Sequence, residues 1–136
     1  MPKLNEIAQG QTLPERSFTA TNVSLFMYNA AIWNPHRIHY DETYTTQVEK
    51  HPGVVIDGPL QGDWLTQAVM DWAGDDGQMV EFEYSNRKAS YLGETLFSGG
   101  EVESIDSAAG EVKLKIFIKN EAGEVTTPGT ATVKFP

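Results

Sequence analysis

The chain has 136 residues, the usual size of one domain, with 40% hydrophobic residues and a formal net charge of −9. This acidity disfavours nucleic acid and anionic membrane surfaces as partners, and the hydrophobic content excludes a disordered chain. The absence of cysteine excludes disulfides, thiolate metal sites and a cysteine nucleophile.

Targeting signals are the next feature to consider. Residues 1–16 are polar and lack the apolar core of a signal peptide. No stretch approaches the roughly 18 apolar residues that a membrane-spanning helix needs. We therefore expect a soluble, cytoplasmic protein formed by one domain, residues 1–136.

The first half of the chain favours short helical and irregular segments. The expected elements are a strand at 18–20, a helix from Thr21 or Asn22 to Ala31, an ordered loop at 33–41, a short helix at 42–48 and an apolar run at 54–56.

The clearest helix spans residues 57–74. Asp57 is a suitable N-cap, Pro59 falls in the first turn, and Gly74 is a suitable stop. One broad face at helical spacing is apolar: Leu60, Trp64, Leu65, Ala68, Val69 and Trp72. This pattern predicts a helix packed against a core.

Strands dominate the rest of the chain. They are expected at 79–84, 95–104, 111–119 and 130–135. The third alternates apolar residues with lysines, and short turn-like segments on either side of it predict antiparallel neighbours. One long helix plus an antiparallel sheet predicts an α+β fold with the helix on one sheet face.

The segment 33–41 (WNPHRIHYD) is unusually rich in polar and ionisable groups for a loop. Neutral histidine is the side chain best suited to moving protons near pH 7. His36 and His39 are three residues apart, so they are expected on one side of a turn. A metal site built on this pair and Asp41 is a weaker alternative, because His51 is the one remaining histidine. A loop that merely satisfies its own backbone is another alternative.

Two segments together resemble the hydratase motif of the MaoC-like hotdog superfamily, NPHRIHYD at 34–41 and PGVVIDGPL at 52–60. The sequence is similar in particular to fungal mitochondrial hydroxyacyl-thioester dehydratases and mesaconyl-CoA hydratases. Further matching segments are YLGET at 91–95, AGEV at 122–125 and the pattern G-x-A at 129–131.

This resemblance implies a single hotdog fold, in which an antiparallel sheet wraps around a long central helix. It implies reversible addition of water to an enoyl thioester carried on coenzyme A or acyl carrier protein, an (R)-type hydratase or 3-hydroxyacyl-thioester dehydratase. No metal or redox cofactor is expected. Because sites in the family lie between two hotdog units, the resemblance also implies a homodimer or a heteromer with a related subunit.

The family's catalytic pair is an Asp and a His five positions later. His39 occupies the His position, whereas Asn34 stands where the Asp is expected. An Asn side chain cannot accept a proton as a base, but its amide can orient a water molecule. We therefore expect His39 to act as general base and Asn34 to hold the water.

Gly58 is the third expected catalytic position, at the start of the central helix. The free N–H groups and the dipole of a helix N-terminus favour the negative charge that develops on a thioester oxygen. A glycine there lets an acyl carbonyl approach the backbone closely.

Five further residues are expected to contact the substrate: His36, Arg37, Asp57, Arg87 and Lys88. The basic side chains suit coenzyme A phosphates. Arg37 is equally well explained by an ion pair with Asp41, and residues 87–88 by a solvated strand end. A helix cap is the commoner role for Asp57.

Two other functions remain open at this point. The Asn at position 34 is compatible with a non-catalytic or partner-dependent hotdog subunit. A hotdog acyl-CoA thioesterase would share the fold, which by itself does not decide function.

Overall fold

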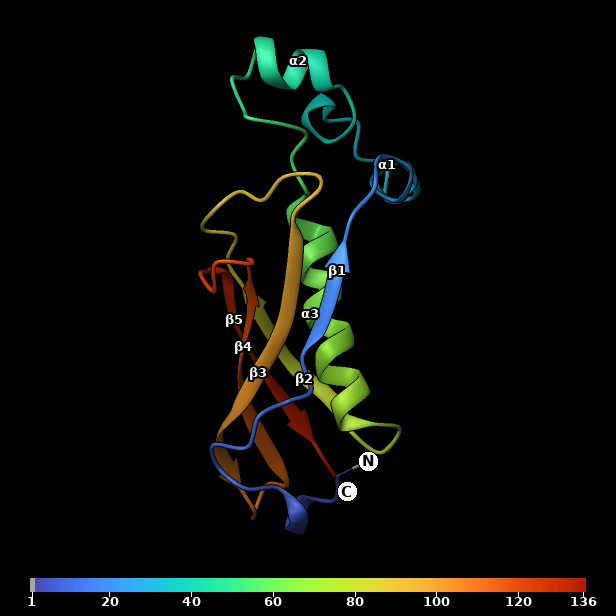
Figure 1. Ribbon diagram of the computed structural model, residues 1–136. Helices are drawn as coiled ribbons and strands as arrows, with labels where there is room; N and C mark the ends of the chain where they lie inside the picture. Colours follow the sequence, from blue (N-terminus) through green and yellow to red (C-terminus); the bar gives the residue numbers. More distant parts are fainter. Residues whose placement is uncertain (1) are drawn as a thin grey trace.

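In the computed structural model, which describes residues 2–136, a curled five-stranded sheet wraps around the long helix α3 (Figure 1). Every strand pair is antiparallel, and the strand order is β1-β3-β4-β5-β2. This architecture confirms the predicted α+β hotdog arrangement. The elements of this core are β1 (Arg16–Thr19), α3 (Gly58–Ala73), β2 (Gln78–Tyr84), β3 (Thr95–Asp106), β4 (Glu111–Lys119) and β5 (Val125–Lys134).

The smaller helices lie outside this core. Figure 1 shows α1 and α2 beyond the N-terminal end of α3, above the sheet. No helix within residues 2–136 has the length and apolar character needed to cross a membrane. These elements are η1 (Leu4–Glu6), α1 (Asn22–Ala31), η2 (Arg37–His39) and α2 (Glu42–Gln47).

The core is built by the two periodicities that the sequence shows. On β4 the four alternating apolar residues are buried, and the intervening lysines point outward. On α3 the predicted face is buried, with Leu65 and Val69 fully enclosed and Trp64 stacked on the Phe18 ring at 4.6 Å between centroids. Burial of both faces against each other accounts for the wrapped helix.

Both ends of α3 match the prediction in position, but the mechanism at its start differs. Gly74 ends the helix with φ 72°, a left-handed value that favours glycine. Asp57 occupies the N-cap position, yet its side chain makes no capping hydrogen bond. The expectation that the Asp57 side chain caps the helix is therefore wrong, because this carboxylate is turned toward α1 instead.

Strand β5 begins at Val125, five residues before the predicted start at residue 130. Proline cannot donate to a ladder, so Pro128 fits within a strand only where its neighbour requires no donor. In the structure Pro128 comes directly before the part of β5 that pairs with β2, which starts at Gly129, opposite Tyr84, the last residue of β2. The Pro128 carbonyl accepts from the Ser85 N–H at 3.0 Å, so its missing N–H faces the end of the ladder.

Candidate functional site

His39 lies in the short helix η2, and its side chain is buried with 8% of its surface exposed. Its Nδ1 atom lies 2.7 Å from the Val55 carbonyl oxygen. A carbonyl only accepts, so Nδ1 carries the hydrogen, and in the uncharged form of the ring Nε2 is the proton acceptor. The Val55 N–H in turn donates to the Ile38 carbonyl at 2.9 Å, which ties η2 to the segment before α3.

A cavity of about 220 Å³ opens beside this imidazole. It is lined by His39, by residues 55–58 and Gln61 at the start of α3, and by the loop 86–89 that follows β2. The Ile56 N–H donates to the Ser90 carbonyl at 2.9 Å, which holds that loop against the start of α3. Five residues predicted from the sequence therefore share one cavity: His39, Asp57, Gly58, Arg87 and Lys88.

Asp57 contributes a buried carboxyl group to the same place. Only 1% of the residue is exposed, and its Oδ1 accepts from Asn29 Nδ2 at 3.3 Å. Its Oδ2 has no hydrogen-bond partner among the described residues. Burial raises the pKa of Asp57, while a positive charge on His39, when that ring is protonated, and the hydrogen bond from Asn29 act in the opposite direction.

Gly58 begins α3, and one side chain packs directly on it. A Cβ at Gly58 would overlap the Nδ2 atom of Asn86. The absence of a side chain thus lets the Asn86 amide lie against the helix N-terminus, where backbone N–H groups are free. Asn86 is a site residue that the sequence did not single out; its one signal was adjacency to the basic pair at 87–88.

Asn34 does not line the His39 cavity. Its Oδ1 accepts from the His36 N–H at 3.1 Å, which closes a turn in the loop. It instead borders a separate apolar groove of about 370 Å³, together with Phe26, Trp33 and Tyr40.

His36 and Arg37 also lie outside the His39 cavity. The exposed His36 ring stands edge-on to the His39 ring, with centroids 5.7 Å apart. The Arg37 guanidinium donates to the Asp41 carboxylate at 2.8 Å and lies over the Tyr44 ring at 4.1 Å. The ion pair considered as the alternative role of Arg37 is thus present. The hydrogen bond from the Tyr44 N–H, followed by the one from Arg37, lowers the pKa of Asp41.

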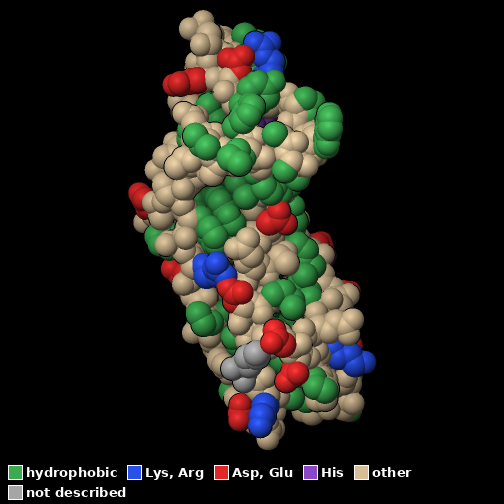
Figure 2. Space-filling view, turned by 90° about the vertical axis from the view of Figure 1, so that its right-hand side faces the viewer, with side chains coloured by type: hydrophobic (Ala, Val, Ile, Leu, Met, Phe, Trp, Pro, Cys, Tyr) green, Lys and Arg blue, Asp and Glu red, His purple; other side chains and the backbone are tan. Residues whose placement is uncertain are grey.

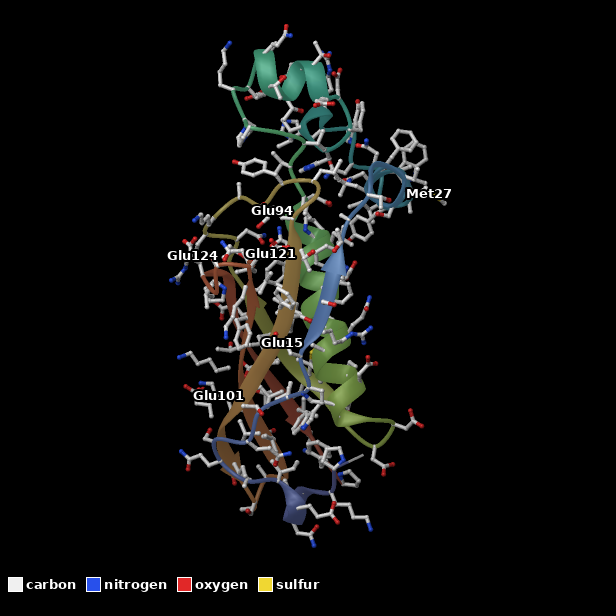
Figure 3. The ribbon with its side chains drawn as sticks, viewed as in Figure 1. Glu15, Met27, Glu94, Glu101, Glu121 and Glu124 are labelled. Atoms are coloured by element: carbon white, nitrogen blue, oxygen red, sulfur yellow. The ribbon has the colours of Figure 1, made fainter. Side chains whose placement is uncertain are left out.

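Arg87 and Lys88 form a cationic rim on the cavity, and both are exposed. Their backbone N–H groups donate to the Thr126 carbonyl at 3.0 and 3.2 Å, which fixes the loop on β5. Lys88 Nζ pairs with Glu124, labelled in Figure 3 at the β4–β5 turn, at 2.7 Å. Within residues 2–136 no group of three or more His, Asp or Glu side chains is arranged to hold a metal ion.

The arrangement combines an imidazole with an unpaired Nε2, a helix N-terminus and a cationic rim. The fold that carries it is a hotdog of the MaoC-like class. A solved MaoC-like dehydratase superposes with a TM-score of 0.91 at 19% identity, covering 99% of this chain and 42% of that one. The ChsH1–ChsH2 complex from Mycobacterium tuberculosis superposes with a TM-score of 0.84 at 17% identity, covering 95% and 98%.

The family itself is defined by the sequence. The model of the family "Hydroxyacyl-thioester dehydratase type 2" matches residues 2–92, and the chain belongs to this family. The mitochondrial hydroxyacyl-thioester dehydratase type 2 of Saccharomyces cerevisiae is 26% identical over 101 residues, 74% of this chain and 34% of that protein. The matched segments span 13% to 34% of the curated relatives, which are much longer proteins.

Proposed function

We propose that the protein is an (R)-type enoyl-thioester hydratase, which adds water to the double bond of an acyl thioester and catalyses the reverse dehydration. One observation carries this proposal: a buried imidazole keeps Nε2 free as a base inside a cavity at the N-terminus of the central helix. Membership of a dehydratase family supports it.

In the proposed reaction His39 Nε2 takes a proton from water while the water oxygen bonds to the β-carbon. The electrons of the double bond move toward the thioester oxygen, where the Gly58 N–H and the dipole of the helix N-terminus stabilise the negative charge. The His39 imidazolium then gives its proton to the α-carbon, which restores the neutral ring. Asn34 would hold the water, which requires its side chain to leave the His36 N–H.

The carrier of the acyl group is proposed to enter past Arg87 and Lys88, whose positive charges suit the phosphates of coenzyme A or of an acyl carrier protein. Arg37 can contribute only by exchanging Asp41 for a phosphate. His36 stands at the edge of the His39 ring and is proposed to contact the substrate there, with Asp57 on the inner wall. The thioester is the substrate, and no further cofactor takes part.

The test follows enoyl absorbance and free thiol together, with the purified chain alone and crotonyl-, mesaconyl- and cinnamoyl-coenzyme A. A hydratase bleaches the conjugated absorbance and releases no thiol. Thiol release would assign a hotdog thioesterase instead. No change with any of the three, and gain of activity on adding a second hotdog subunit, would assign a partner-dependent subunit.

A second hotdog unit is proposed to cover the outer face of α1. Residues 22–35 carry no charged side chain, although 21% of the chain is charged. Val23, Met27 and Trp33 are 68%, 64% and 91% exposed, and Met27 projects outward from α1 in Figure 3. Figure 2 views the molecule from the side on which α1 lies in Figure 1, and it shows hydrophobic side chains gathered around a hollow in the upper half of this face. An apolar patch of this kind is typical of an interface.

The oligomeric state tests this pairing by size-exclusion chromatography with light scattering over a range of concentrations. We expect a dimer of the wild-type chain that dissociates when Met27 and Trp33 are both changed to Ser. Val125→Ser is the matched control, because Val125 is 46% exposed at the start of β5, away from α1. A wild-type chain that stays monomeric at all concentrations would leave only a different subunit as the partner.

A further inference from the structure

Asp57 has one carboxyl oxygen without a hydrogen-bond partner in the His39 cavity. Its Oδ1 accepts from Asn29 Nδ2 at 3.3 Å, whereas its Oδ2 has no partner among the described residues. The residue is 1% exposed, so bulk water supplies no donor either. Of the described side chains that line this cavity, Asp57 is the one with a buried polar atom in this state. A buried acceptor without a donor is costly, so this oxygen points to a donor that arrives with a bound molecule.

The carboxyl group is held in place from two sides. Asn29 Nδ2 also lies 2.9 Å from the Leu25 carbonyl, which only accepts, so this atom is the amide nitrogen and its two hydrogens go to Leu25 and to Asp57 Oδ1. On the other side, the Val55 carbonyl, two residues before Asp57, accepts from His39 Nδ1 at 2.7 Å. The carboxyl group and the imidazole are therefore fixed at one cavity, and Oδ2 is the oxygen left for a bound molecule.

A water molecule that attacks the double bond has two hydrogens, and the base takes only one of them. The other hydrogen stays on the oxygen and needs an acceptor. We propose that Asp57 Oδ2 accepts this hydrogen, and that it keeps the hydrogen bond to the 3-hydroxyl group that the water becomes. This inference rests on the proposed hydratase function.

In this role Asp57 is a catalytic residue that moves no proton. The proton released by the water goes to His39 Nε2, the water oxygen bonds to the β-carbon, and the remaining O–H bond is unbroken. The ionised carboxylate is the form that acts, because a protonated Oδ2 would donate instead of accept. An acceptor that is already held by Asn29 orients the water without being reorganised during the reaction.

The first arm of the test measures recognition of the hydroxyl group without turnover. In the His39→Ala background, calorimetry compares (R)-3-hydroxybutyryl-coenzyme A with butyryl-coenzyme A. We expect the hydroxy thioester to bind about tenfold more tightly, the usual effect of one hydrogen bond to a charged group. The added change Asp57→Asn should abolish this preference, because Asn29 Nδ2 retains the oxygen of the new amide and its NH2 group then replaces the acceptor.

Asp63→Asn is the matched control for this arm. Asp63 is an exposed acid on α3 that accepts from the Tyr28 hydroxyl at 2.6 Å and does not line the cavity. The tenfold preference should therefore survive this change in the His39→Ala background.

The second arm is kinetic and uses crotonyl-coenzyme A with His39 intact. Asp57→Asn should lower kcat about 100-fold, the usual effect of a misplaced reactant, while its melting temperature at pH 8 does not fall below that of wild type. A hydroxyl preference that is absent, or that persists in the Asp57→Asn protein, would overturn the role of Asp57, as would a kcat within threefold of wild type. A preference that depends on Asp57 in a protein without hydratase activity would sustain it and overturn only the proposed function.

Discussion

Replacing His39 separates its chemical role from its structural role, because the two ring nitrogens do different things. Nδ1 donates to the Val55 carbonyl at 2.7 Å, whereas Nε2 is the proposed base. His39→Ala removes both functions. His39→Asn supplies an amide N–H near the position of Nδ1 but has no nitrogen that can accept a proton.

The expected magnitudes follow from these contacts. Loss of a general base costs about 10²- to 10⁴-fold in rate, or about 3–5 kcal/mol in the barrier. Leaving the Val55 carbonyl without its buried donor costs about 1–3 kcal/mol of folding free energy. We therefore expect His39→Ala to lose both rate and stability. His39→Asn should lose the rate alone and recover most of the stability.

The assay combines initial rates of enoyl absorbance loss with urea denaturation of each variant. His51→Ala is the matched control: His51 is half-buried, lies 6.0 Å from the Tyr91 ring between centroids, and does not line the cavity. We expect its rate to stay within about twofold of wild type. A rate within threefold of wild type in either His39 variant would refute the assignment of His39 as the base.

Three further predictions concern stability. Burial raises the pKa of Asp57, so its protonated carboxyl group contributes fully to the free energy of unfolding at low pH, and this contribution is lost as pH rises through the raised pKa. Asp57→Asn should therefore have a higher melting temperature than wild type at pH 8, and the difference in melting temperature should shrink toward pH 4. An equal difference in melting temperature at both pH values would contradict this. Burial and the hydrogen bond to Asp63 raise the pKa of Tyr28, so unfolding becomes easier above about pH 10 as unfolded tyrosine ionises; Tyr28→Phe should reduce that loss in urea melts at pH 8 and 11. A Cβ at Gly100 would lie 2.6 Å from a backbone carbonyl oxygen of β4, but one at Gly99 would meet only the end of a phenylalanine ring at 3.0 Å. Gly100→Ala should cost about 3 kcal/mol and Gly99→Ala about 1 kcal/mol, and similar values for both would refute the argument.

Much of the fold could be predicted from local pattern. The apolar face of residues 57–74 repeats at helical spacing, and residues 111–119 alternate, so burial alone selects helix and strand there. The early start of β5 was not predicted, because Pro128 is tolerated only where the ladder between β5 and β2 has ended, one residue before Gly129. Whether a missing N–H matters depends on the neighbouring strand, which local sequence does not specify.

Which residues make up the site was harder to predict from the sequence than the fold. Residues 33–41 concentrate ionisable groups, which predicts a functional loop, and the motif resemblance indicates His39 within it. Its tautomer depends on the Val55 carbonyl, sixteen residues away, so only the structure decides which nitrogen is free. Asn86 had no signal beyond its adjacency to the basic pair at 87–88, since its place in the site comes from its contact with Gly58.

The sequence by itself therefore determined the class of fold, the central helix and the alternating strands, and it predicted His39 as the catalytic residue. Hydrophobic periodicity and a dense polar motif are local properties, and they can be read along the chain. Only the tertiary structure decided that Asn34 and His39 line different cavities and that the loop 86–89 closes over the start of α3. These relations depend on hydrogen bonds between segments far apart in the chain, such as that from Ile56 to Ser90, and no local pattern records which backbone groups will meet.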